Sequence, residues 1–140
     1  ISKHRCVVIA DGYYEWKRAG KRKIPHYIYS QNRGLLPMAG LWSSRTGPGG
    51  NTENTYTVIT TDARTTVRTV HHRMPVILER EAFPLWLDVN NVSVTDALPM
   101  LLPYMGNLSI KEVSTIVNST SHNSPDCLEQ INNRQTLDLF

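Results

Sequence analysis

The chain has little cysteine and no long apolar run. Only two cysteines, Cys6 and Cys127, occur among its 140 residues, and their separation matches neither a disulfide framework nor a metal-binding spacing. Two free thiols are typical of a reducing compartment. No apolar stretch approaches the ~20 residues of a membrane span, and the opening residues, ISKHRCVVIADG, lack the apolar centre of a signal peptide. We therefore expect a protein that is not secreted and makes no membrane contact.

Common catalytic and cofactor motifs are also missing. The sequence has no P-loop, no GxGxxG, no GxSxG and no zinc-knuckle spacing. The adjacent His71 and His72 would point in opposite directions on an extended segment, and no third ligand stands at a useful spacing. Cys127 and His122 could form a nucleophilic pair on paper, but the segment between them is typical of a turn. We expect no metal and no organic cofactor.

The composition fits one soluble domain with a core of its own. Hydrophobic residues make up 40% of the chain and charged residues 19%. The net charge of +3 permits a polyanionic partner without requiring one. Five basic residues crowd the turn at 17–23, where a solvated hairpin tip is the simpler interpretation. Arg64, Arg68 and Arg73 bracket the two histidines and indicate a track for phosphates.

Hydrophobic alternation and turn residues predict many short strands followed by a few short helices. We expect Asp62 to cap the first helix and Ser93 the third. The stretch 43–55 is rich in Gly, Ser, Thr and Asn, which predicts an exposed loop. Strands are expected at 5–10, 13–17, 25–30, 36–42, 56–61, 76–78 and 110–118, and helices at 63–69, 80–88 and 94–102. This order predicts an α+β fold with a mainly antiparallel, barrel-like sheet and short flanking helices.

Two segments carry residues suited to acid–base chemistry. In DGYYEW, Glu15 stands among aromatic residues in a predicted strand, and alternation places Tyr13 on its face. Most strand carboxylates are simply exposed, but a partly buried one can exchange protons near neutral pH. In VHHRMPVIL, one histidine facing inward would supply an acid–base group, while the other and Arg73 face a ligand.

Taken in order, these motifs resemble one family. The chain is similar to the SOS-response-associated peptidase (SRAP) family, and most similar to its eukaryotic branch. The resemblance runs from Arg5 to about Leu128 and rests on RCVVIADGYYEWK, KIPHYIY, MAGLW, TYTVITTDA, HHRMPVIL, WLD, VSTIVN and NSPDCL. The pair formed by DGYYEW and HHRMP is its most specific part.

The resemblance implies a function in DNA repair. Family members recognise abasic sites in single-stranded DNA and crosslink to them through an N-terminal cysteine, which forms a thiazolidine with the sugar aldehyde. It also implies peptidase, hydrolase or lyase-type activity. Residue by residue, the catalytic glutamate is Glu15 and the catalytic histidine is His71, while Thr60, His72 and Arg73 contact the DNA. We expect a monomer whose partner is abasic single-stranded DNA, located in the nucleus of a eukaryote or on the bacterial nucleoid.

The start of the chain departs from the family. Family domains begin Met-Cys-Gly-Arg, whereas this chain begins Ile-Ser-Lys-His. We therefore expect residues 1–140 to be a single incomplete SRAP domain, with a core at about 5–128 and a tail at 129–140, that is inactive by itself. Cys6 cannot replace the missing nucleophile because its nitrogen lies in a peptide bond. Two other functions stay open: a non-catalytic single-stranded DNA-binding module, and a thiol peptidase that processes its own N-terminus.

Overall fold

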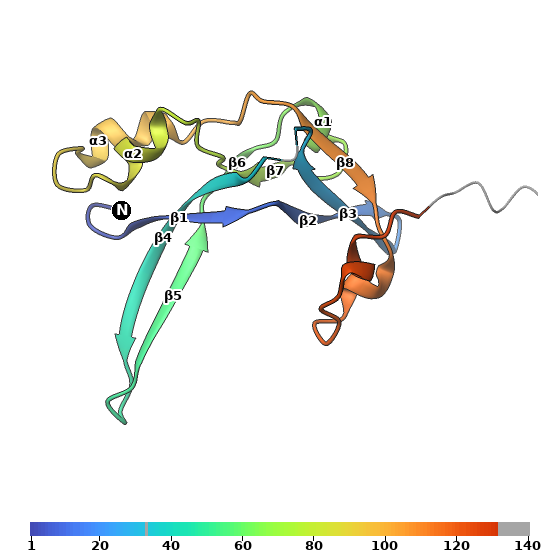
Figure 1. Ribbon diagram of the computed structural model, residues 1–140, viewed down its shortest axis with the longest axis horizontal. Helices are drawn as coiled ribbons and strands as arrows, with labels where there is room; N and C mark the ends of the chain where they lie inside the picture. Colours follow the sequence, from blue (N-terminus) through green and yellow to red (C-terminus); the bar gives the residue numbers. More distant parts are fainter. Residues whose placement is uncertain (33, 132–140) are drawn as a thin grey trace, which may run out of the picture.

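Three antiparallel sheets make up the fold of the described residues, 1–32 and 34–131 of the computed structural model (Figure 1). The first sheet joins β1 (Arg5–Ala10), β4 (Leu36–Thr46) and β5 (Thr52–Val58). The second joins β2 (Gly12–Ala19), β3 (Arg22–Ser30) and β8 (Leu108–Glu112), and the third pairs β6 (Thr60–Asp62) with β7 (Arg73–Pro75). The predicted α+β class and antiparallel pairing are confirmed.

The predicted barrel-like closure is wrong, because the three sheets in the described part of the chain do not close on one another. Only Asp11 separates β1 from β2 in the sequence. Yet β1 pairs with β4, whereas β2 pairs with β3, so the chain passes from one sheet directly into the next. The two sheets therefore separate after Asp11 and do not form one closed barrel.

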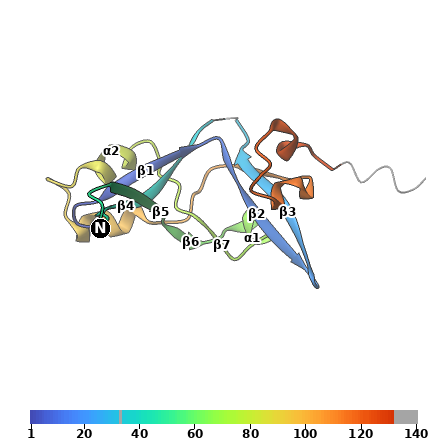
Figure 2. The same ribbon diagram turned by 90° about the horizontal axis from the view of Figure 1, so that it is seen from below.

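The helices are all short. They are α1 (Thr65–Arg68), α2 (Ala82–Leu87) and α3 (Val94–Ala97), with 3₁₀ turns η1 (Leu98–Met100), η2 (Thr115–Asn118) and η3 (Pro125–Leu128). Within residues 1–32 and 34–131, no helix has the length and apolar character needed to cross a membrane. Figures 1 and 2 both show α2 and α3 at one end of the molecule and the β2–β3 hairpin at the other.

Two hydrophobic clusters form the core, and β4 separates them. Met38 belongs to a cluster with Ile28 and Met74, whereas the next residue, Ala39, belongs to a cluster with Trp86. Successive side chains of a strand point to opposite faces, so β4 covers a core on each side. This arrangement explains why the segment reads as almost continuously apolar.

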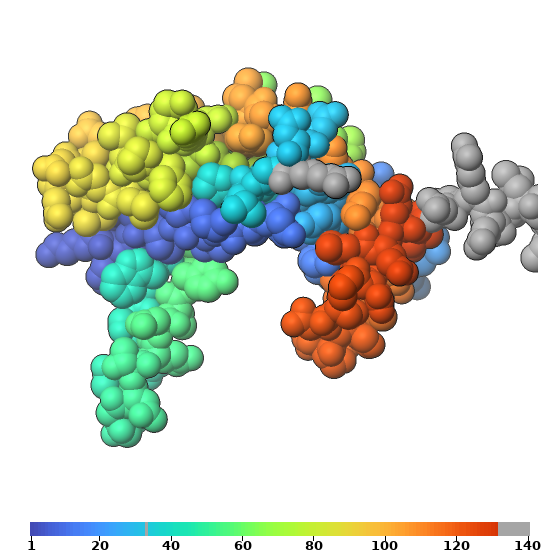
Figure 3. All heavy atoms as spheres, in the orientation of Figure 1, coloured from blue at the N-terminus to red at the C-terminus, as the bar shows by residue number. Residues whose placement is uncertain are grey.

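Beyond the core, β4 and β5 continue as an arm where the sequence predicts a loop. The ladder runs from Gly40 paired with Val58 out to Thr46 paired with Thr52, and Gly50 adopts a positive φ of 78° in the turn. The side chains at 43–46 and 52–55 are exposed on both faces. With no buried face there is no apolar alternation to indicate a strand. Figure 3 shows the arm projecting from the same side as the C-terminal segment.

Three smaller expectations also fail. The strand predicted at 110–118 ends at Glu112, since Ser114 accepts a hydrogen bond from the Ile116 amide and starts a 3₁₀ turn. The strand predicted at 76–78 contributes only an isolated bridge between Ile77 and Met38. Asp62 does not cap α1, which follows Arg64 and has no side-chain cap.

The Ser93 cap of α3 is confirmed by the Asp96 amide, which donates to Ser93 Oγ at 3.2 Å.

Candidate functional site

Glu15 lies in the middle of β2 on its inward face. Alternation puts it beside Tyr13, which packs against the Ile28 cluster. Its side chain is 25% exposed, and Oε1 accepts a hydrogen bond from the Trp16 amide at 3.1 Å. The carboxylate is therefore held at the edge of the core and still open to a ligand.

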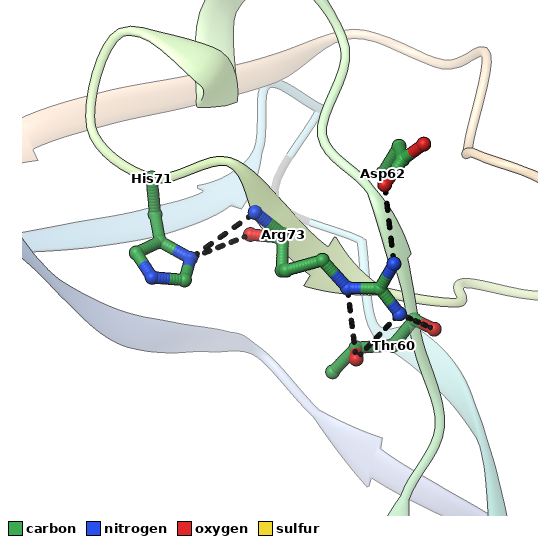
Figure 4. Close-up of polar contacts among 4 residues, drawn as sticks. All are labelled: Thr60, Asp62, His71 and Arg73. Carbon is green, nitrogen blue, oxygen red and sulfur yellow. Dashed lines mark hydrogen bonds and ion pairs between the residues drawn. The ribbon is translucent and has the colours of Figure 1, made fainter.

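His71 comes from the turn that follows α1. Its main-chain amide donates to the Val67 carbonyl at 3.0 Å, which extends the last turn of the helix. Its Nδ1 lies 3.1 Å from the Arg73 amide, which can donate to it, and 3.2 Å from the Arg73 carbonyl (Figure 4). Neutral His71 can accept from the amide, whereas protonated His71 can donate to the carbonyl, so both charge states find a partner.

The fold brings these two side chains together. His71 Nδ1 lies 3.8 Å from Glu15 Oε2, and the histidine side chain is 35% exposed. Glu15 lies in β2 and His71 in the turn before β7, so the two residues are far apart in the sequence. This separation is within reach of a proton transfer through small side-chain movement or one water. The structure thus places Glu15 and His71 side by side, and a shared functional site with its chemical roles stays a prediction.

The two histidines do not point in opposite directions. Their ring centroids lie 4.4 Å apart with an angle of 38° between the planes. The expectation of opposite directions assumed extended backbone, but residues 70–72 form a turn and a bend, and β7 begins only at Arg73. His72 is exposed beside His71. No group of three or more His, Cys, Asp or Glu side chains is placed to hold a metal among the residues the structure describes.

The Arg73 side chain forms hydrogen bonds to the neighbouring strand, β6. Its guanidinium donates to Asp62 Oδ1 at 3.1 Å, to the Thr60 carbonyl at 2.6 Å, and to Thr60 Oγ1 at 3.1 Å (Figure 4). The β6–β7 register sets this contact by pairing Asp62 with Arg73 and Thr60 with Pro75. Thr60 and Arg73, both predicted DNA contacts, therefore touch each other. Asp62 is the partner that sequence reasoning assigned to a helix cap instead.

Tyr13 is a further member of the site that the sequence did not single out. Its hydroxyl is buried and has no hydrogen-bond partner within the described residues. Burial, and then the nearby Glu15 carboxylate, raise the pKa of the Tyr13 hydroxyl. The hydroxyl therefore stays protonated and can only donate or accept a neutral hydrogen bond. Its position two residues from Glu15 was the available signal.

The remaining predicted residues lie away from this pair. The basic turn at 17–23 is an exposed hairpin tip, as expected. Cys6 is partly buried, whereas Cys127 is buried. The Cys127 thiol meets the His122 main-chain carbonyl at 3.8 Å. Nothing in that contact orients the imidazole toward the sulfur.

Comparisons with known proteins agree on one family. Residues 1–120 match the family described as SOS response associated peptidase (SRAP). A Xenopus tropicalis protein named abasic site processing protein HMCES is 40% identical over 91% of this chain and 43% of its own length. The Bacillus subtilis abasic site processing protein YoqW is 39% identical over 89% of this chain and 57% of its own length. A crystal structure from Bacteroides thetaiotaomicron superposes with a TM-score of 0.84 at 28% identity, covering 94% of this chain and 59% of that one.

Proposed function

Because the chain belongs to the SRAP family, we propose that it is the later part of an abasic-site-processing enzyme, with its core at about residues 5–128. The Glu15–His71 pair carries this proposal, with Nδ1 and Oε2 3.8 Å apart. The relatives from Xenopus tropicalis and Bacillus subtilis are named abasic site processing proteins, which supports abasic DNA as the substrate. The chain spans 43% to 57% of the length of those two relatives.

In this proposal, the nucleophile is an N-terminal cysteine supplied by a segment that precedes Ile1 in the intact protein. Its amine attacks the aldehyde of the ring-opened abasic sugar and loses water to give an imine. Its thiolate then adds to the imine carbon, and a proton on the nitrogen completes the thiazolidine ring. The overall change joins one amine, one thiol and one aldehyde with release of one water. The aldehyde itself is the electrophile.

Glu15 and His71 would divide the proton transfers of this sequence. Glu15, which accepts a main-chain hydrogen bond from Trp16, can take a proton from the nucleophile and return it to the leaving hydroxyl. His71 can donate to the sugar oxygen as the ring opens, since both of its charge states have a partner at Arg73. General acid–base groups of this kind typically contribute ~10²–10⁴-fold to a rate.

Thr60, His72 and Arg73 would bind the DNA strand beside the lesion. The Arg73 side chain is 42% exposed, so a phosphate can approach its guanidinium without displacing Thr60. The exposed His72 ring lies against His71 and offers a flat surface to a base or sugar. We propose single-stranded DNA because an unpaired strand can present an extrahelical sugar to a partly buried pair. The proposed protein is a monomer acting in the nucleus or on the nucleoid.

A crosslinking assay tests this function. The chain is extended at its N-terminus by a family segment that begins with cysteine, and is incubated with single-stranded DNA containing one abasic site. We expect an adduct that survives denaturing electrophoresis, and a rate that falls ~10²–10⁴-fold in Glu15→Gln and in His71→Asn. Lys21→Gln, on the exposed hairpin tip, is the control and should not change the rate.

Two outcomes would favour the other functions. A restored protein that binds abasic DNA without any adduct would be a non-catalytic binding module. A restored protein that trims its own N-terminus at wild-type rate after Glu15→Gln, yet forms no adduct, would be a thiol autopeptidase; the family description names a peptidase. A heat-stable adduct formed by the present chain would place the nucleophile at Cys6 or Cys127.

A further inference from the structure

A cavity lies beside α1, and neither Glu15 nor His71 is among its lining residues. It has a volume of about 360 Å³ and opens between α1 and the segment that leads into β8. None of its lining residues belongs to the Glu15–His71 pair or to the Arg73 contacts. A cavity of this size falls at the small end of the range that holds organic ligands, and it exceeds the needs of a single ion.

The polar lining consists of groups that can donate hydrogen bonds. These are the side chains of Gln31, Arg64, Thr65, Thr66 and Asn107. No carboxylate lines the cavity in the described part of the chain. A group of donors with a guanidinium and no acid is the chemistry that recognises a phosphate.

Arg64 is available to such a ligand. Its guanidinium contacts the Met105 thioether, a weak acceptor. Within residues 1–32 and 34–131, no carboxylate lies within 4.0 Å of it, in contrast to Arg73 with Asp62. A phosphate could replace the thioether as a much stronger acceptor for the same donor.

The rest of the lining is apolar and includes one aromatic ring. Val67 and Met74 are buried and form the floor with Leu108. The ring of Tyr104 lies so close to Gly106 that any side chain at that position would clash with it. The glycine therefore makes room for the ring in the lining of the cavity, where a base or a sugar can pack against it.

The main chain at the mouth of the cavity is strained. Thr65 has a φ of 29°, an unusual value for a β-branched residue. Such outliers cluster at ligand clamps and active sites. Thr65 lies directly between Arg64 and Thr66, two of the proposed donors.

We propose that this cavity binds a nucleotide, with the phosphate at Arg64 and the hydroxyl and amide donors, and the base or sugar against Tyr104 and the apolar floor. The nucleotide can be free in solution or part of a DNA strand bound at His72 and Arg73. A DNA strand is a source with a structural basis, because Val67 links the two places. Val67 lines the cavity, and its main-chain carbonyl accepts a hydrogen bond from the His71 amide. This binding site goes beyond the proposed crosslinking and needs no activity of Glu15 or His71.

Amide chemical shifts of the isotope-labelled chain test the proposal with three probes: deoxyadenosine monophosphate, inorganic phosphate and a short oligodeoxythymidylate. We expect the amides of Thr65, Thr66, Gly106 and Asn107 to shift with the mononucleotide, the oligonucleotide, or both. A response to the mononucleotide assigns the site to a free ligand, and a response to the oligonucleotide alone assigns it to a strand. A response to inorganic phosphate at the same affinity as the mononucleotide would overturn the nucleotide assignment.

Arg64→Gln should weaken the binding of the probe that shifts the cavity amides at least about tenfold. This is the loss expected for hydrogen bonds to a charged group. Arg45→Gln is the matched control, since it removes the same guanidinium from the exposed β4–β5 arm, outside the cavity. Asn107→Ala serves as a second variant if Arg64→Gln loses the dispersed spectrum of the folded chain. Equal losses at Arg64 and Arg45, or an absence of shifts at the cavity with every probe, would overturn the proposal.

Discussion

The two ends of the molecule hold their polar side chains in different ways. At the α2–α3 end, Arg5 is 5% exposed, donates to the Asp88 and Val92 carbonyls at 3.0 and 2.8 Å, and lies over the Trp86 ring. At the other end, Glu15 and His71 are 25% and 35% exposed and have partners that can exchange. Arg5 is fixed to main-chain carbonyls and excluded from solvent, which suits a structural role. Glu15 and His71 stay accessible, which suits proton transfer.

The largest expected effect on stability comes from the structural end. Trp86 is fully buried, and its indole Nε1 donates to the Cys6 carbonyl at 2.8 Å. Trp86→Ala leaves a cavity and an unpaired carbonyl, so we expect a loss of about 3–5 kcal/mol in the free energy of unfolding. Urea unfolding monitored by circular dichroism measures this loss. Trp42→Ala, at a partly exposed position on β4, is the control and should cost far less.

The next effect concerns DNA binding at the accessible end. Arg73→Glu should weaken binding of single-stranded DNA by about tenfold or more and should lower the slope of log K against log salt by about one. Lys21→Glu makes the same charge reversal on the exposed hairpin tip and should have a smaller effect. Fluorescence anisotropy at several salt concentrations distinguishes the two variants. Equal losses at both positions would indicate non-specific attraction and remove the special role of Arg73.

The smallest expected effect concerns Asp62, the partner of Arg73. The Asp62–Arg73 pair is exposed, with Asp62 at 80%, so Asp62→Asn should change the free energy of unfolding by less than about 1 kcal/mol. The same substitution removes a competitor for the guanidinium and a negative charge from the DNA path. We therefore expect tighter binding of single-stranded DNA by the variant. Weaker binding would show that Asp62 positions Arg73 instead of competing for it.

Sequence reasoning succeeded where one face of a segment is buried. The strands β1 to β3 were predicted nearly in place, because their apolar residues alternate or run together against a core. The arm formed by β4 and β5 was missed because its residues 43–46 and 52–55 are exposed on both faces. Its hydrogen bonds come from the ladder alone, and a ladder leaves no trace in hydrophobic periodicity.

The candidate site shows the same limit. Glu15 and His71 were each recognisable as acid–base groups, but residue patterns alone gave no distance between them, and their pairing came from the family resemblance. The Asp62–Arg73 contact depends on the register of two three-residue strands. The contact between the His71 and His72 rings depends on a bend just before β7. Both features arise from tertiary contacts that short motifs do not encode.

We propose that Glu15 and His71 act as one acid–base unit. A double-mutant cycle of the two residues tests this proposal. Initial rates of adduct formation are measured for the N-terminally extended protein and for its Glu15→Gln, His71→Asn and doubly substituted variants. Residues that act as a unit give strongly non-additive losses. We therefore predict that the double variant is no slower than the slower single variant. Losses that multiply, so that the double variant shows the product of the two single effects, would contradict a shared unit.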